Sequence, residues 1–159
     1  MKIDHVNIVV SDMDRSVEFY TRLGLRPSLD TFISGAWIAK VVGIRDENLK
    51  ARVVFMEPDS GNTRLELIEY IIPAGQEVPA NSHTNTPGLR HFAFVVDDLM
   101  KIYQELSRAG VTFFSEPQEV SGNKEVAARI GRKQQVYFLD PDGVIVELAQ
   151  YGPPGVANG

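Results

Sequence analysis

The chain has 159 residues, of which 43% are hydrophobic and 23% charged, and its 16 basic and 21 acidic residues give a net charge of −5 at pH 7. These values are typical of a compact globular protein, and the acidic balance without a long basic stripe argues against nucleic acid as a partner. The chain contains no cysteine, which excludes disulfides, thiolate zinc sites and cysteine nucleophiles and leaves any metal to nitrogen and oxygen ligands.

The start of the chain and the distribution of apolar residues predict a cytoplasmic protein. No apolar run approaches the roughly 18 residues that a membrane-spanning helix needs, so no membrane partner is expected. The opening segment MKIDHVNIVV carries one Lys, an Asp within the apolar stretch and no small-residue cleavage site, which is a poor match to a secretory signal.

The first half of the chain predicts a strand, a helix and three further strands. A β-rich run over 3–10 is followed by Asp12, whose carboxylate can accept the free amides of a first helical turn. Apolar residues then recur at helical spacing until Gly24, where a positive φ is tolerated and a helix can end. Extended stretches follow at 26–33, 51–56 and 63–70, so the order is βαβββ.

The second half repeats the first. HVNIVVSDMDRSVEFYTRLGL (5–25) lies without gaps on HFAFVVDDLMKIYQELSRAGV (91–111), so that His5 meets His91. A second match places LELIEY (65–70) on VELAQY (146–151), where Glu66 meets Glu147. The repeat predicts a helix after Asp98, a Pro-Asp-Gly turn at 141–143, and strands at 90–96, 111–116, 134–139 and 144–150.

These patterns divide the chain into two modules within one domain. Residues 1–72 and 88–152 each contain one βαβββ unit. The stretch between them, 73–87, reads PAGQEVPANSHTNTP and is rich in Pro, Asn, Ser and Thr, as expected of a connector that crosses the surface. Residues 153–159 are expected to form a flexible tail.

Four duplicated residues predict a metal site. Because side chains alternate between the faces of a strand, each first strand presents one histidine and each last strand one glutamate on a single face. If the two modules pair around a central cleft, two imidazoles and two carboxylates converge. This donor set suits zinc, nickel, cobalt, manganese or ferrous iron and leaves positions for water or substrate. The residues are His5, Glu66, His91 and Glu147.

A non-metal interpretation of these residues stays open at this point. One histidine at the start of a strand is usually a surface or core residue, but two of only three histidines lie at equivalent places of a duplication. Glu66 and Glu147 lie between apolar neighbours, where burying an unpaired carboxylate is costly and a metal would relieve the cost. The alternative is that both glutamates face solvent from a one-sided sheet.

The chain resembles the vicinal oxygen chelate (VOC) superfamily, which includes glyoxalase I, methylmalonyl-CoA epimerase, extradiol dioxygenases, and fosfomycin- and bleomycin-resistance proteins. The resemblance rests on DHVNIVVSDMDRSVEFYTRLGL, GNTRLELIEY, GLRHFAFVVDDL and YFLDPDGVIVELAQY, and it covers nearly everything except the connector and the tail. In pattern the chain is closest to glyoxalase I and methylmalonyl-CoA epimerase. The resemblance implies an α+β fold in which paired βαβββ modules form a U-shaped half-barrel around one divalent metal ion, in a homodimeric protein. The metal ligands that it implies are His5, Glu66, His91 and Glu147.

Within this superfamily the fourth ligand, Glu66, favours proton transfer over oxygen chemistry. In extradiol dioxygenases of the superfamily, two histidines and one carboxylate hold the iron and leave three coordination positions open. In this chain Glu66 would occupy one of those positions. The leading hypothesis is a metal-dependent lyase or isomerase that moves a proton next to the carbonyl of a small carbonyl compound or thioester. By resemblance Glu147 is the first choice for the base, with Glu66 its partner. The alternatives are two purely structural glutamates, a ring-cleaving dioxygenase, and a non-catalytic small-molecule binding or resistance protein.

Four further residues are predicted to contact the substrate. Asn7 follows His5 by two positions and so shares its strand face. Trp37 lies in an apolar insertion, TFISGAWIAKVVGI (31–44), without a counterpart in the second half, where it either roofs the pocket or packs in the core. By resemblance to methylmalonyl-CoA epimerases a further glutamate is expected on the strand KARVVFM (50–56), which carries no acid, and the nearest titratable residue is Arg52. Arg129 lies in a basic stretch that either attracts an anionic substrate or is a solvated loop.

Overall fold

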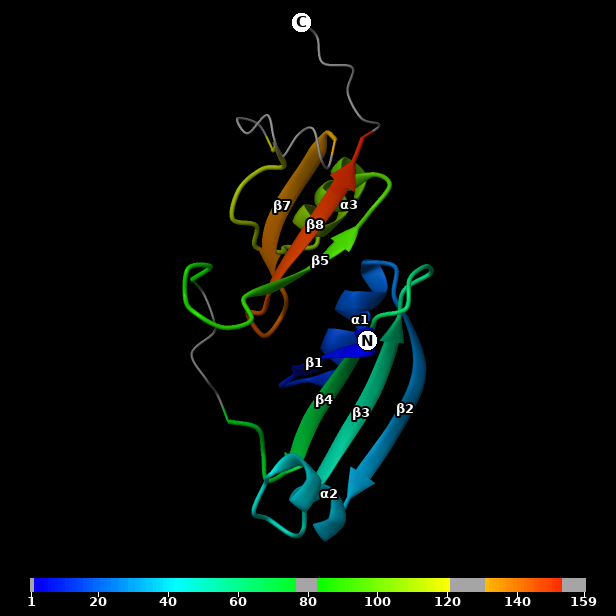
Figure 1. Cartoon of the computed structure of the whole chain (residues 1–159), viewed down its shortest axis with the longest axis vertical. Coiled ribbons are helices and arrows are strands. Elements are labelled where there is room, and N and C mark those ends of the chain that lie inside the picture. Colours follow the sequence, from blue (N-terminus) through cyan, green and yellow to red (C-terminus); the bar gives the residue numbers. More distant parts are fainter. Residues whose placement is uncertain (1, 77–82, 121–130, 153–159) are drawn as a thin grey trace, which may run out of the picture. The chain divides into compact units, whose positions relative to one another are not determined.

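The chain folds into two compact units, Met1–Val78 and Pro79–Gly159, which are the first and the second module. The computed structural model describes residues 2–76, 83–120 and 131–152. Each module contains one four-stranded sheet with helices packed on it (Figure 1). The predicted α+β class with two βαβββ modules is confirmed, and the boundary between the units falls inside the segment 73–87.

In the first module the sheet order is β1-β4-β3-β2, with β1 parallel to β4 and the other pairs antiparallel. The first and the last strand of the module are therefore neighbours, although the rest of the module separates them in the chain. The elements are β1 (His5–Val9), α1 (Met13–Arg22), β2 (Arg26–Ser34), α2 (Ala36–Val42), β3 (Lys50–Glu57) and β4 (Arg64–Ile72).

Helix α1 covers one face of this sheet. Asp12 caps it as predicted, because its side chain accepts a hydrogen bond from the backbone N–H of Arg15 at 3.0 Å. The buried side chains of Met13 and Tyr20 line the helix, and α1 packs against β2, β3 and β4. The strand positions paired in register on this face are buried and apolar, as in the pair Val54 and Leu67.

Helix α2 lies in the apolar insertion 31–44, for which no helix was predicted. It belongs to a buried cluster on the face of the sheet opposite to α1, and it ends at Gly43, whose φ of 76° suits a residue without a side chain. This insertion therefore covers part of the face that carries the predicted ligands. The buried cluster consists of Ile38, Ala39, Leu49, Ala51, Val53 and Ile68.

The second module repeats the topology with the order β5-β8-β7-β6, and β5 is again parallel to β8. Asp98 caps its helix by accepting a hydrogen bond from the backbone N–H of Lys101 at 2.9 Å. The elements are β5 (His91–Val95), α3 (Leu99–Arg108), β6 (Gln118–Glu119), β7 (Lys133–Leu139) and β8 (Ile145–Tyr151).

The prediction of a strand over 111–116 was wrong in length, because this segment forms only an isolated bridge at Phe113. The chain runs along β7 only briefly, where the N–H of Leu139 donates to Thr112 and the N–H of Phe114 donates to Tyr137. Pro117 follows, and because proline has no N–H it cannot continue a ladder. Pairing resumes only in the two-residue strand β6.

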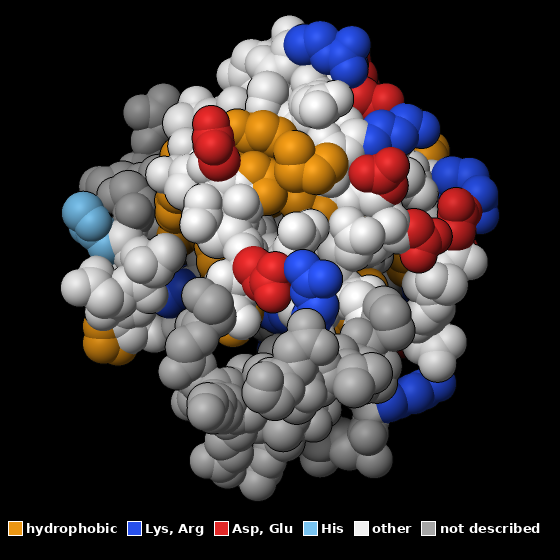
Figure 2. Space-filling model, turned by 90° about the horizontal axis from the view of Figure 1, so that it is seen from above, with side chains coloured by type: hydrophobic (Ala, Val, Ile, Leu, Met, Phe, Trp, Pro, Cys, Tyr) orange, Lys and Arg blue, Asp and Glu red, His pale blue; other side chains and the backbone are white. Residues whose placement is uncertain are grey.

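The surface carries charges of both signs. Figure 2 shows Asp and Glu side chains lying among Lys and Arg side chains around a small group of hydrophobic ones on the face drawn. Of the helices in the described part of the chain, none combines the length and the apolar character that a membrane crossing requires.

Candidate metal centre

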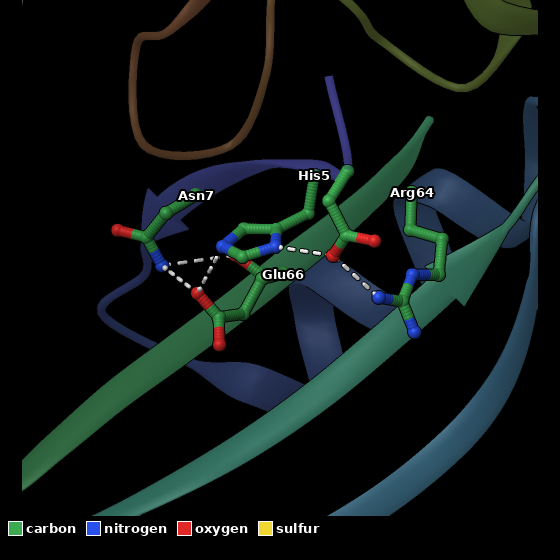
Figure 3. Close-up of polar contacts among 5 residues, drawn as sticks. His5, Asn7, Arg64 and Glu66 are labelled. Atoms are coloured by element: carbon green, nitrogen blue, oxygen red, sulfur yellow. Dashed lines mark hydrogen bonds and ion pairs between the residues drawn. The ribbon is translucent and has the colours of Figure 1, made fainter. Parts of the chain in front are cut away.

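The first candidate half of the site is the pair His5 and Glu66. Strand β1 pairs with β4 so that Asn7 lies opposite Glu66. Because His5 is two residues before Asn7, the side chains of His5 and Glu66 lie on the same face of the sheet (Figure 3). The Nε2 atom of His5 is 3.5 Å from the Oε2 atom of Glu66. The side chains are 39% and 20% exposed, so both are reachable from solvent.

Asp4 and Arg64 orient the His5 ring. The Nδ1 atom of His5 lies 2.9 Å from Oδ2 of Asp4, and the same oxygen accepts a hydrogen bond from Nη2 of Arg64 at 2.6 Å. Hydrogen bonds from His5 and Arg64 hold the pKa of the Asp4 carboxyl below its usual range. A proton on Nδ1 leaves the lone pair of Nε2 directed toward Glu66, which is the arrangement common in metal-binding histidines.

Asn7 holds the carboxylate of the same pair. Its side-chain amide lies 3.1 Å from the backbone oxygen of Glu66 and 3.3 Å from Oε2 of that residue. Figure 3 shows the amide pointing at Glu66 beside the His5 ring. The ring of Phe55 meets the His5 ring edge-on, with centroids 5.8 Å apart, and closes one side of the pair.

The second candidate half is the pair His91 and Glu147. Strand β5 lies beside β8 with Ala93 opposite Glu147, the same register as in the first module. The Nε2 atom of His91 is 3.2 Å from Oε2 of Glu147. The histidine is again 39% exposed, but the glutamate side chain is only 4% exposed.

Two donors compensate for the burial of Glu147. Lys133 donates a hydrogen bond from Nζ to Oε1 at 2.6 Å, and Tyr137 donates from its hydroxyl to Oε2 at 2.9 Å. Burial and the hydrogen bond to Glu147 raise the pKa of Tyr137 to about 12, so the phenol is protonated and acts as a donor at neutral pH. The buried carboxylate is therefore paired with an ammonium group and hydrogen-bonded, as a buried charge must be.

Both pairs fit a divalent metal ion by donor type and by spacing. Ligand atoms about 2.0–2.2 Å from an ion, at octahedral or tetrahedral angles, lie roughly 2.8–3.6 Å apart. The separations of 3.5 Å and 3.2 Å between imidazole nitrogen and carboxylate oxygen fall in this range. Each pair supplies two donors, and the described residues contain no single cluster of three or more His, Asp or Glu side chains arranged for a metal.

Of the predicted contact residues that the structure describes, Asn7 alone lies beside a candidate ligand. Trp37 lies at the start of α2 and is 65% exposed. Arg52 is on the sheet face opposite to Glu66, where it forms ion pairs of 2.7 Å with Asp14 and with Asp30, so it does not join the pair. Arg129 lies outside the described residues.

The contacts of Lys133 and Tyr137 with Glu147 were not expected from the sequence, in which Lys133 belongs to the basic stretch around Arg129 and Tyr137 has no predicted role. Both lie on β7 on the same face as Glu147, because Tyr137 is directly opposite Glu147 and Lys133 is four positions away. The strand KQQVYFL could have indicated these contacts. Alternate residues of a strand share a face, so its lysine and tyrosine lie on the face of the last-strand glutamate once the hairpin register is fixed.

Comparison with known proteins agrees with this architecture. Residues 2–148 match the Glyoxalase/Bleomycin resistance protein/Dioxygenase superfamily. The chain belongs to this superfamily. The resemblance on which the sequence analysis relied is thereby confirmed, and the solved structure of a glyoxalase family protein from Bacillus cereus shares the fold, with a TM-score of 0.83 at 20% identity over 96% of this chain and 95% of that one.

Relatives whose names give an activity match at 21–28% identity. A lactoylglutathione lyase of Arabidopsis thaliana is 26% identical over 94% of this chain, which spans only 44% of that protein. A 2-epi-5-epi-valiolone epimerase of an Actinomyces species is 28% identical over 92% of this chain and 77% of its own length. A glyoxalase I of Leishmania major shares the fold with a TM-score of 0.59 at 21% identity, over 94% of this chain and 86% of that one. The relatives thus include a lyase and an epimerase that act on small molecules.

Proposed function

We propose that the protein is a divalent-metal-dependent lyase or isomerase that transfers a proton at the carbon next to a carbonyl group. The observation that carries this proposal is the occurrence of the same imidazole–carboxylate pair, in the same strand register, in both modules. The lyase and the epimerase among the relatives give it independent support.

In this proposal one ion is held by His5, Glu66, His91 and Glu147 together, because each pair alone supplies only two donors. The connector 73–87 would join the two modules in a single domain. When bound, the ion supplies Lewis acidity, which makes the proton next to a carbonyl easier to remove. Zinc, nickel, cobalt, manganese and ferrous iron all suit these donors.

The remaining tasks fall to residues of the chain. Asp4 and Arg64 fix the ring of His5, and Asn7 holds the carboxylate of Glu66. One carboxylate, Glu66 or Glu147, takes the proton from the substrate carbon and returns it to the product, which is general acid–base catalysis.

The substrate class is a small carbonyl compound or thioester. The names of the relatives suggest two starting compounds, lactoylglutathione and 2-epi-5-epi-valiolone. Trp37, exposed at the start of α2, and Arg129 remain proposed substrate contacts. We further propose a homodimer in the cytoplasm.

Two measurements test this function. The first is the metal content of the purified protein, which is expected to be close to one divalent ion per chain. The second is NMR detection of solvent deuterium incorporated into lactoylglutathione, 2-epi-5-epi-valiolone, and a panel of hydroxy-ketones and acyl thioesters. Exchange that needs metal and is lost in the doubly substituted protein E66Q/E147Q supports the proposal. Ferrous iron with oxygen uptake on catechols would overturn it in favour of ring cleavage, and failure to bind any divalent metal would leave a binding protein.

A further inference from the structure

Both carboxylate oxygens of Glu147 are held by hydrogen bonds. Lys133 donates to Oε1 at 2.6 Å and Tyr137 donates to Oε2 at 2.9 Å. The Nε2 atom of His91 lies 3.2 Å from Oε2, so that oxygen is the one directed toward the candidate metal position. The lysine and glutamate side chains are only 16% and 4% exposed, so water does not replace these bonds readily.

The side chain of Glu66 is held much more weakly, because the positions of the first module that correspond to Lys133 and Tyr137 have apolar side chains. Phe55 is opposite Glu66 as Tyr137 is opposite Glu147, and Ala51 is opposite Tyr70 as Lys133 is opposite Tyr151. Phe55 has no hydroxyl and Ala51 has no amine. Among the described residues, the side chain of Glu66 accepts a hydrogen bond only from the amide of Asn7, to Oε2 at 3.3 Å, and none reaches Oε1.

The two glutamates therefore differ in how easily they rotate. Turning Glu147 away breaks two hydrogen bonds and separates a carboxylate from an ammonium group in a place shielded from water, where such a separation is costly. Turning Glu66 breaks one long amide contact, and water can reach its partly exposed carboxylate. A carboxylate that acts as a base in a metal site must leave the ion when substrate arrives, and this motion is open to Glu66.

Resting on the proposed function, we propose that Lys133 and Tyr137 are positioning residues that hold Glu147 as a permanent metal ligand and leave Glu66 to detach and act as the base. In the proton transfer the C–H bond next to the carbonyl breaks and a Glu66 oxygen takes the proton. The electron pair of that bond moves toward the carbonyl oxygen, and the proton returns to carbon when the product forms. This assignment reverses the order of the two glutamates expected from sequence resemblance.

A reciprocal exchange of one hydroxyl between the modules tests the assignment. Phe55→Tyr places a hydroxyl opposite Glu66, and Tyr137→Phe removes the one opposite Glu147. Each variant is loaded with Co(II) and titrated with acetohydroxamate. This probe binds a metal ion through two adjacent oxygens, so one protein carboxylate must leave the ion when it binds. Phe55→Tyr is expected to weaken acetohydroxamate binding about tenfold, the usual size of one hydrogen bond behind a metal ligand, while Tyr137→Phe changes it less than about threefold. Tighter binding in Tyr137→Phe together with no change in Phe55→Tyr would identify Glu147 as the mobile carboxylate and overturn the assignment.

The role of Lys133 has its own readout in the absorption spectrum of bound Co(II), without probe or substrate. Lys133→Met frees Oε1 of Glu147 to bind the ion as a second oxygen, which changes the coordination number and hence the visible band. Lys50→Met, at an exposed lysine that lies over the ring of Phe32 in the first module, is the matched control and leaves the band unchanged. If Lys133→Met does not fold, Lys133→Gln keeps a neutral donor and is expected to give a smaller change of the same kind. An unchanged band in a folded Lys133 variant overturns the positioning role.

These outcomes are separable from failure of the proposed function. A wild-type protein that binds no Co(II) contradicts the function and the assignment together. Wild-type protein that binds Co(II) and acetohydroxamate, combined with reversed effects in the two aromatic variants, contradicts only the choice of Glu66.

Discussion

The two modules keep the same imidazole–carboxylate pair but differ in the residues that surround it. In the first module Glu66 has Phe55 opposite it, and helix α2 covers more of the same face through the buried residues Ala51 and Val53. In the second module the corresponding face carries Lys133 and Tyr137 around a buried Glu147. The backbone register of the pair is the same in both modules, whereas the neighbouring side chains differ.

This difference teaches that a duplicated site need not use its two halves alike. Strand pairing fixes where each histidine and glutamate lie, and it is independent of most side chains. Neighbouring positions on the same face then decide whether the carboxylate is restrained or free. The half with hydrocarbon neighbours keeps a mobile carboxylate, and the half with a lysine and a tyrosine keeps a fixed one.

The largest effect on stability is expected from Lys133→Met in the metal-free protein. Glu147 would lose its ammonium partner while staying buried, which costs about 3 kcal/mol of unfolding free energy for the second module. Asn7→Ala, the matched change beside Glu66, should cost less than about 1 kcal/mol because that carboxylate is partly exposed. Urea unfolding at pH 7 measures both values, and equal losses would contradict the difference between the two halves.

The helix caps test the part of the comparison that is symmetric. Asp12→Ala and Asp98→Ala each remove a side-chain acceptor from the first turn of a helix, at 3.0 Å and 2.9 Å from the backbone nitrogen. Each substitution should lower the unfolding free energy by about 1 kcal/mol. Denaturant midpoints of the two variants provide the measurement, and a loss confined to one module would show that the duplication does not extend to its caps.

A pH-dependent difference is expected in the first module from Asp30. The hydrogen bond from Arg52 lowers the pKa of the Asp30 carboxyl from 3.8, so the carboxylate stabilises the folded state above that pH, and this contribution is lost as pH falls through the folded-state pKa. Asp30→Asn should therefore lose stability less steeply than wild type below about pH 4, with a cost below about 1 kcal/mol at pH 7. Thermal unfolding between pH 3 and 7 gives the slopes, and parallel profiles would rule out this contribution.

The smallest effect, and of opposite sign, is expected at Ser16. Its side chain is buried on α1 and its hydroxyl oxygen has no hydrogen-bond partner among the described residues, whereas the aligned position of the second module is Ile102. Ser16→Ala should raise stability by about 0.5 kcal/mol, because it removes an unsatisfied polar group from the interior. A calorimetric melting temperature below that of wild type would show that the hydroxyl is satisfied in solution.

Much of the fold followed from the sequence because the duplication gave two independent copies of one pattern. The strands of His5, Glu66, His91 and Glu147 were predicted correctly, since alternation and repeat spacing are local properties. Helix α2 was not predicted, because its seven residues are apolar except for Lys40 and span too few turns for a helical period to be recognised. Proline at 117 was the overlooked signal that shortened the strand near it.

The candidate site was predictable in its residues but not in their partners. Arg52 is the titratable residue nearest to the place where the resemblance implies a further glutamate, yet the pairing of β3 with β2 puts it beside Asp30 on the other face. Lys133 and Tyr137 gain their meaning only from the β7–β8 register, which sets the residue that faces Glu147. Contacts between strands depend on register, and register is a tertiary property.

The parallel pairing of β1 with β4 also sets an order of events during folding. Asn7 and Glu66 are 59 residues apart in sequence, and among the strands that the structure describes β1 pairs with β4 alone. During synthesis on the ribosome β1 is made early but cannot pair until β4 has been made. Long-range parallel strand pairs are also among the slower contacts to form. The imidazole and the carboxylate therefore meet only when their module is complete, so a nascent chain that has not yet reached β4 carries His5 without the carboxylate of Glu66.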